Sequence, residues 1–406
     1  MRTDIHFNKS LEELPIPISH WMGMTDTTFT QDNFDSTMEQ AYNLAFHPLT
    51  RARVSIMADG HPGMGMPIGG VIGCEKGLIP NAVGSDAGCG VLFTQLTLKA
   101  SGLTIDNLIN IVDEIYNRIP IGFGEWREEP NKDFKMIVPD IRFIQDQTEN
   151  LKLQMGTLGG NNHFIDILAD KDDFLCIMVH CGSRNLGSKI NTEYNKRALK
   201  MCKRWYSSIP NEQLAFLPIG EKDTREYIKA LEFAVDFAYN NRASIVKSVI
   251  EIIHEELSRR IVVGSTVNST HNYAVQENHF SKNLWVHRKG AIKLQEGTLG
   301  VVPGSMGTSS YIVRGLGNKL SFDSCSHGAG RIMSKTKANE TFKKEDVEEH
   351  MNREGIIFPS FTQDRKGRWN VCESHFAYKD IEKVISNQAD ICEPINRLTP
   401  LAVIMG

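Results

Sequence analysis

A carboxylate and a thiol stand three residues apart, as Asp86 and Cys89, in a segment (residues 83–90) that contains three glycines. Apolar residues on both sides of it predict two buried strands, joined by a sharp turn that carries both side chains toward one cleft. A thiolate and a carboxylate at this spacing repel each other unless a cation lies between them. The pair is therefore a candidate metal site in which Cys89 bridges two ions. Alone, such a pair is more often a buried structural cysteine beside a turn aspartate.

Three histidines favour the metal site. His163 stands between a glycine-rich run and a predicted strand over residues 164–168, and His180 follows a predicted strand over residues 174–179. His271 lies in a further polar junction. Histidines in loops at the ends of buried strands are well placed to bind metals, although each alone is more often a core residue. By ligand type alone, a thiolate with imidazoles favours zinc.

His327 belongs to a second kind of site. It begins a His-Gly-Ala-Gly-Arg run that leads into a predicted helix over residues 331–339. Such a run offers a nucleophile, exposed backbone N–H groups and a guanidinium together. Further positive charge is available from Arg184, Lys289 and Arg314. Combined with the metal ligands, these groups indicate phosphoryl or nucleotidyl transfer at a centre of one or two metal ions.

Composition limits the class of protein. The chain has 406 residues, of which 41% are apolar and 23% charged, as expected for a globular protein with a large core. It has no run long enough for a membrane helix and no signal-peptide core, so we expect no membrane association. The eight cysteines are scattered without a CxxC pair, which favours a reducing, cytoplasmic compartment. The net charge of −4 excludes a generally basic surface that coats nucleic acid, but allows a local basic cleft.

The apolar patterns predict the scaffold. Repeats, low-complexity runs and linkers are absent from the sequence, so we expect one domain over residues 1–406. The periodicity predicts helices over 104–118 and 224–257, the second as one long helix or two with a break. It also predicts a hairpin of strands 284–287 and 291–294 whose turn projects two positive charges, and a final strand over 401–405.

Six motifs together resemble the RtcB family of RNA-splicing ligases. They lie, in the family's order and spacing, at residues 84–90, 162–165, 180–184, 271–273, 303–307 and 326–331. The resemblance covers almost the whole chain. It implies an α+β fold around central β-sheets. It also implies an enzyme that joins an RNA 3′-phosphate or 2′,3′-cyclic phosphate to a 5′-hydroxyl, using GTP and two manganese ions. An accessory activating protein is a further partner that the resemblance allows.

The resemblance also implies a role for each residue. Cys89 would bridge the two manganese ions, His180 and His271 would complete one ion, and Asp86 and His163 the other. His327 would be the nucleophile that takes GMP, and Asp59 would orient or deprotonate the RNA 5′-hydroxyl. The guanylate would be held by Ser305, Ala329, Gly330 and Tyr378, with Phe164 and Asp166 at the base, and phosphates by Asn162, Arg184 and Lys289.

Three positions depart from the family pattern. Ala58 replaces a proline before Asp59, Asp166 replaces a glutamate, and Met405 replaces a near-terminal lysine. The metal ligands and the nucleophile are retained, so we expect an active ligase, in tRNA splicing or as a specialised RNA-repair paralogue. One alternative is a metal-dependent cyclic phosphodiesterase or phosphatase that acts on RNA ends. Retention of His327 argues against it, because hydrolysis needs no covalent nucleotide. The other is a non-catalytic RNA-binding partner protein, against which the intact catalytic positions argue.

Overall fold

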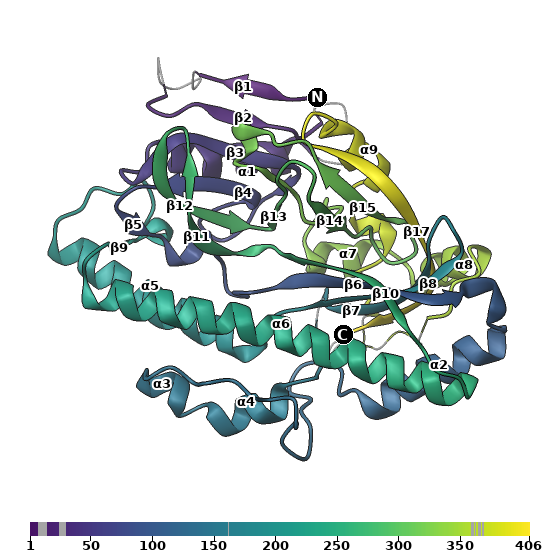
Figure 1. The fold of residues 1–406 in the computed structure, drawn as a ribbon. Helices are drawn as coiled ribbons and strands as arrows, with labels where there is room; N and C mark the ends of the chain where they lie inside the picture. Colours follow the sequence, from purple (N-terminus) through teal and green to yellow (C-terminus); the bar gives the residue numbers. More distant parts are fainter. Residues whose placement is uncertain are drawn as a thin grey trace.

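The structure is a computed structural model that describes residues 1–406 except 7–13, 24–29, 161, 359–360, 362, 364–366 and 368. Helices and sheets are both extensive, which confirms the predicted α+β class. Helices α5 and α6 run side by side along the lower side of the sheets in Figure 1, and α3 and α4 lie beneath them. Among the described residues, no helix has the length and apolar character needed to cross a membrane.

Two large sheets form the framework. The six-stranded sheet has the order β1 (Thr3–Ile5), β2 (Ile18–His20), β3 (Thr50–His61), β4 (Ile68–Cys74), β12 (Lys282–Lys289), β11 (Asn272–His279). The seven-stranded sheet has the order β10 (Val263–Thr270), β6 (Gly90–Lys99), β8 (Phe174–Cys181), β7 (Phe164–Ala169), β17 (Cys392–Met405), β15 (Ser310–Gly315), β14 (Leu299–Val302). Two short pairs are β13 (Ala291–Lys293) with β16 (Ser324–Ser326), and β5 (Gly77–Leu78) with β9 (Leu217–Pro218). Among these pairs only β2 and β3 run parallel.

The helices cover the sheets. They are α1 (Gln31–Ala45), α2 (Ile105–Arg118), α3 (Arg142–Gln145), α4 (Thr148–Gln154), α5 (Asn185–Arg204), α6 (Lys222–Leu257), α7 (Lys335–Thr341), α8 (Lys344–Arg353) and α9 (Ile381–Asn387). Short 3₁₀ turns are η1 (Pro80–Ala82), η2 (Ala100–Gly102), η3 (Glu212–Leu214), η4 (Lys319–Ser321) and η5 (His375–Ala377). Thr104 and Asn107 form a reciprocal capping box that begins α2, as its sequence predicts.

Helix α6 is one continuous helix and joins the two main cores. Its first half, including Phe237, packs into the core that α1 and α5 share. Its second half, including Ile245 and Val249, packs with α2 against the seven-stranded sheet. Between the two halves lie Asn241 and Arg242, which are polar yet fully buried. The predicted long helix is thus confirmed in its unbroken form.

The predicted hairpin is wrong. Strand β12 pairs with β4 and β11, whereas β13 pairs with β16, so the two segments are not partners. Arg288 and Lys289 are also buried at the end of β12 instead of projecting from a turn. Arg288 makes two hydrogen bonds with Glu277, at 2.7 and 3.0 Å, and this buried carboxylate neutralises it. Local pattern could not reveal that partner, which lies eleven residues away on the neighbouring strand.

The helix predicted from residue 331 begins later, at Lys335. Arg331 instead forms an isolated bridge with Tyr378, and Ser334 caps α7 by accepting a hydrogen bond from the backbone N–H of Lys337. Arg331 is therefore fixed beside the functional cavity described below.

Buried histidines predict sensitivity to acid. Burial lowers the pKa of His47 to about 4, against a weaker opposing hydrogen bond to Leu214, and burial lowers that of His287 to about 4 as well. The unfolded chain, with a pKa near 6.5, binds more protons between pH 4 and 6.5. Stability should thus fall as pH drops through this window, by roughly 3 kcal/mol per histidine at most. Urea unfolding from pH 4 to 7 measures this slope.

The variant His47→Gln should be less stable at pH 7, yet lose less stability on acidification. The exposed His254, changed to Gln, is the matched control and should leave the slope unchanged. Equal slopes in the native chain and His47→Gln would show that His47 does not contribute.

Candidate metal and nucleotide site

The turn that carries Asp86 and Cys89 is tied to the junction between β10 and β11. The backbone N–H of Cys89 donates to the Asp86 carbonyl at 3.1 Å, which closes the turn. The N–H of Gly88 donates to the Asn272 carbonyl at 2.8 Å, and that of His271 donates to the Cys89 carbonyl at 2.9 Å. The backbone therefore holds His271 next to Cys89, although they are far apart in sequence.

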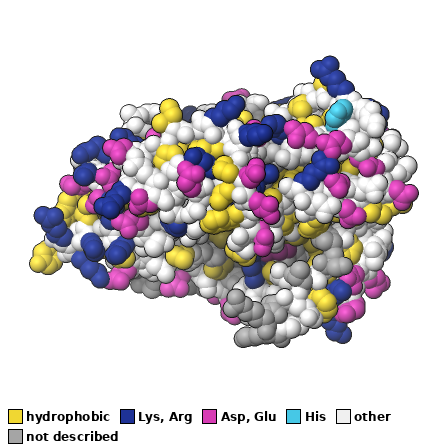
Figure 2. Space-filling model, turned by 90° about the horizontal axis from the view of Figure 1, so that it is seen from below, with side chains coloured by type: hydrophobic (Ala, Val, Ile, Leu, Met, Phe, Trp, Pro, Cys, Tyr) yellow, Lys and Arg dark blue, Asp and Glu magenta, His cyan; other side chains and the backbone are white. Residues whose placement is uncertain are grey.

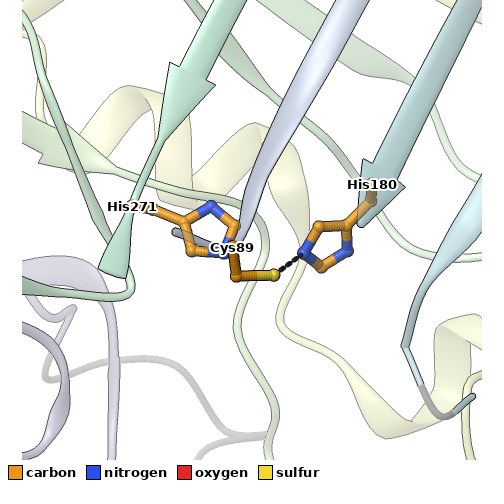
Figure 3. Close-up of side chains that lie close together, drawn as sticks. All are labelled: Cys89, His180 and His271. Atoms are coloured by element: carbon orange, nitrogen blue, oxygen red, sulfur yellow. Dashed lines mark hydrogen bonds between the residues drawn. The ribbon is translucent and has the colours of Figure 1, made fainter. Parts of the chain in front are cut away.

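The five predicted metal ligands come together as two groups that share one sulfur. Cys89 lies with His180 and His271 in one group, and with Asp86 and His163 in the other. Within each group the ligand atoms lie within 4.8 Å of one another. Cys89 Sγ lies 3.2 Å from His180 Nε2 and 3.5 Å from His163 Nε2 (Figure 3 shows the first group). This shared sulfur is the geometry that a bridging thiolate requires.

Hydrogen bonds orient the imidazoles. His180 Nδ1 lies 2.8 Å from the Asn162 carbonyl, which directs Nε2 at the sulfur. His163 Nε2 lies 3.0 Å from Asp86 Oδ2. His271 Nδ1 is buried and has no hydrogen-bond partner among the described residues. A buried nitrogen without a partner is unfavourable, and a bound cation near this ring would compensate for it.

The charges of the site also fit a cation. Burial, and then the nearby Asp86 carboxylate, raise the pKa of Cys89 to about 12. Burial lowers the pKa of His180 and of His271 well below the usual value, so both imidazoles are neutral, the form that can bind a cation. A divalent ion bound beside Cys89 would favour its thiolate form at neutral pH.

Two residues of α6 position this centre, and sequence reasoning missed both. Arg242 Nη1 donates to the carbonyls of Gly88, at 2.9 Å, and of Cys181, at 2.7 Å. Asn241 accepts from the N–H of Gly156 at 2.7 Å. The only signal in the sequence is that these polar residues interrupt an apolar helical stripe.

His327 follows β16 and is held by Asp59 of β3. Asp59 Oδ2 accepts hydrogen bonds from His327 Nδ1, at 2.6 Å, and from its backbone N–H, at 3.2 Å. Asp59 is fully buried, and its Oδ1 has no partner among the described residues. With Nδ1 engaged, Nε2 is the nitrogen left for chemistry. The His327 ring lies 4.6 Å from the His271 ring, centroid to centroid.

A cavity of about 410 Å³ is lined by His327 and by candidate ligands of both groups, although Cys89 and His271 are not among its described lining residues. The predicted residues that line it are Asp86, Asn162, His163, Phe164, Asp166, His180, Ser305, His327, Ala329, Gly330 and Tyr378. Burial raises the pKa of Asp166 well above its usual value, and its Oδ1 lacks a partner among the described residues. A donor edge, such as that of guanine, would satisfy this carboxyl. Gly330 has φ +76°, and a Cβ there would lie 2.3 Å from the Asp59 carbonyl, so this wall requires glycine.

Arg184, Lys289 and Asp59 are not among the described residues that line this cavity. Lys289 Nζ instead donates to the carbonyls of Met64, Met66 and Asn81. Arg184 donates to Thr157 Oγ1 at 3.0 Å and to the Gly122 carbonyl at 3.2 Å. Both cations thus brace loops around the site.

The cavity also has charged residues that sequence reasoning did not single out. Glu373 and Lys335 line it, and Lys335 Nζ lies 2.8 Å from Glu373 Oε1. Arg331 Nη1 donates to Glu373 and to the Tyr378 hydroxyl, each at 3.1 Å. These contacts fix the Tyr378 ring in the cavity wall.

Gly182 gives a test of the candidate metal ligands that changes none of those residues. A Cβ at Gly182 would lie 2.1 Å from Asp86 Oδ1, so Gly182→Ala must displace that carboxylate. We expect manganese affinity to fall about tenfold or more, with little change in melting temperature. Calorimetric titration with manganese measures the affinity.

The control is Gly102→Ala, because no atom lies within 4 Å of the added Cβ. It should bind manganese as the native chain does. Unchanged affinity in Gly182→Ala would show that Asp86 does not bind an ion from this position.

Comparison with known proteins identifies the family to which the chain belongs. The family model described as tRNA-splicing ligase RtcB matches residues 40–406. Two Escherichia coli proteins are each 35% identical over 393 residues, covering 91% of this chain and 93% of the relative: RNA-splicing ligase RtcB1 of strain ATCC 25922 and RNA-splicing ligase RtcB of strain K12. The tRNA-splicing ligase RtcB of Pyrobaculum aerophilum is 28% identical over 447 residues, covering 92% and 91%. The chain therefore belongs to the RtcB family.

Proposed function

We propose that the chain is an RNA ligase that uses GTP and two manganese ions to join 3′-phosphate or 2′,3′-cyclic phosphate ends to 5′-hydroxyl ends. One observation carries this proposal: His327 lines the same cavity as ligands from both groups that share Cys89. The relatives named above are RNA-splicing ligases, which supports RNA as the substrate. Sulfur and imidazole ligands suit zinc by type, so manganese rests on the family membership.

The residues would act as follows. Cys89 would bridge the ions, with His180 and His271 on one, and Asp86 and His163 on the other. Bound ions would neutralise phosphate charge and so make the phosphorus accessible to a neutral nucleophile. Ser305, Ala329, Gly330 and Tyr378 would hold the guanylate, Phe164 and Asp166 its base, and Asn162 a phosphate.

The proposed reaction proceeds in three transfers, each with its own leaving group. His327 Nε2 forms a bond to the α-phosphorus of GTP while the bond to pyrophosphate breaks. The RNA 3′-phosphate next takes the GMP group, so the N–P bond breaks and His327 is regenerated. The 5′-hydroxyl then attacks the activated 3′-phosphate, and GMP leaves. A 2′,3′-cyclic phosphate must first be opened by water.

The hydrogen bonds of Asp59 favour a role in orienting His327 over a role in contacting RNA. Its carboxylate holds the Nδ1–H tautomer of His327 and orients the ring, which keeps the lone pair on Nε2. We therefore propose Asp59 as a positioning residue for guanylylation, in preference to a base for the 5′-hydroxyl.

The face in Figure 2 carries Lys and Arg side chains interspersed with Asp and Glu, without a continuous basic field. With a net charge of −4, the chain would hold RNA through a local group of cations. Both sheets contribute to the cavity that His327 lines, which supports one catalytic domain over residues 1–406. An accessory activating protein stays a prediction.

Retained radioactivity tests the covalent step. The native chain, incubated with manganese and α-labelled GTP and then denatured, should keep label, and His327→Ala should lose both label and RNA joining. His254→Ala, a change at an exposed histidine on α6, should keep both. Label retained in His327→Ala would exclude His327 as the nucleophile. RNA-end hydrolysis without label in the native chain would favour the phosphodiesterase alternative.

Met405 gives a test of base selection. It pairs with Phe164 between β17 and β7, and it lines the cavity with Asp166. A thioether cannot donate a hydrogen bond to a base oxygen, whereas a lysine can. A charge-assisted hydrogen bond contributes roughly 1.5–3 kcal/mol, or about one to two decades of affinity. Met405→Lys should therefore raise the preference for GTP over ATP in His327 labelling.

The native chain should still prefer GTP, because Asp166 can accept from the N–H groups of guanine. Equal labelling by ATP would contradict this. An unchanged GTP/ATP ratio in Met405→Lys would place residue 405 away from the base.

A further inference from the structure

A second cavity, of about 710 Å³, adjoins the first. The two share four wall residues, namely Met306, Lys335, Glu373 and Met405. Three of the candidate metal ligands, Asp86, His163 and His180, line the first cavity, and none of the five lines the second. The proposed nucleotide and metal chemistry does not use the second cavity, although the two cavities share these four lining residues.

The second cavity has the lining that a nucleobase requires. Four aromatic residues line it, namely Tyr116, Phe123, Phe358 and Phe361, together with the polar side chains of Thr336, Asn339 and Asn370. Rings stack on the face of any base, and amide or hydroxyl groups bond to its edge. Phe123 is 75% exposed, so solvent has access to its ring and a ligand has area to cover.

The loop that carries Phe123 is tied to the metal centre. The N–H of Gly122 donates to the Leu158 carbonyl at 3.1 Å, and Arg184 donates to the Gly122 carbonyl at 3.2 Å. The Phe123 ring lies against Gly160, where an added Cβ would come within 2.6 Å of it. Gly160 lines the first cavity, three residues before the ligand His163. A base on Phe123 would therefore belong to a nucleotide whose phosphate can reach the metal centre.

We propose that the second cavity binds the base of the 3′-terminal nucleotide of the RNA, an inference that rests on the proposed ligase function. Asp166 and the His327 loop line only the first cavity, which assigns that cavity to the guanylate. The 3′-phosphate strand has to stay bound through two steps, activation and joining, whereas the 5′-hydroxyl strand is needed only in the second. Stacking on rings makes this subsite tolerant of base identity.

The test compares an RNA whose 3′-phosphate nucleotide carries a base with one in which that nucleotide is abasic, using the full chain with GTP and manganese. In Phe123→Ala, the KM for the base-bearing RNA should rise about tenfold, while labelling of His327 by GTP stays at the native level. The abasic RNA should show a similarly raised KM with the native chain, and Phe123→Ala should add little to it. Trp205→Ala, a change at a half-exposed aromatic outside both cavities, is the control and should behave as the native chain.

A direct reading comes from 2-aminopurine as the 3′-terminal base. Its fluorescence should be quenched by stacking when the RNA binds, and Phe123→Ala should remove much of that quenching. The proposal is overturned if Phe123→Ala raises the KM for abasic RNA and for base-bearing RNA equally. It is also overturned if the rise in KM caused by Phe123→Ala disappears only when the nucleotide at the 5′-hydroxyl end is abasic. It is also overturned if, in Phe123→Ala, labelling by GTP falls while the KM for RNA does not rise, since the cavity would then take the guanylate. Absent labelling in the native chain would instead contradict the ligase function itself, and the subsite with it.

Discussion

The metal centre depends on the hydrogen bonds that the buried guanidinium of Arg242 donates to two backbone carbonyls. The guanidinium joins the carbonyl of Gly88, in the turn before Cys89, to that of Cys181, directly after His180. These carbonyls belong to two segments that are about ninety residues apart in sequence. A buried charge with several carbonyl acceptors is geometrically demanding, so it fixes their separation more tightly than apolar packing would. Removing it would leave these acceptors buried and would release the turn from the strand end.

Buried cations that bind backbone carbonyls recur around the cavity. Lys289 binds the carbonyls of Met64, Met66 and Asn81, and Lys379 binds those of Ala58 and Gly60, on either side of Asp59. Irregular backbone near a buried site has carbonyls that sheets and helices cannot satisfy. Buried lysines satisfy them here by donating from Nζ. The loops are therefore ordered before any ligand binds, which favours a preorganised site.

This use of cations explains what could be predicted from sequence and what could not. The cluster of candidate metal ligands was recognisable because thiol, imidazole and carboxylate groups are informative by type, and glycine-rich junctions mark where they emerge. Helices α2 and α6 were recognisable because their apolar spacing is local. The partners of Arg288 and Arg242 were not, because a buried cation is identified only by acceptors elsewhere in the fold. The wrong hairpin has the same origin, since β12 and β13 take partners other than each other.

The relation between His327 and the metal centre follows from two short contacts. Asp59 fixes the His327 ring from one side, through Nδ1 and the backbone N–H. On the other side lies the ring of His271, at 4.6 Å between centroids, and His271 is held to Cys89 by the backbone. The His327 ring, the proposed nucleophile, is therefore held in position relative to the proposed ions. A phosphorus bound between them would meet Nε2 and positive charge together, so attack needs no further rearrangement of the protein. In the proposed guanylylation, positive charge would develop on the ring as the N–P bond forms, and the buried Asp59 carboxylate at Nδ1 would stabilise it.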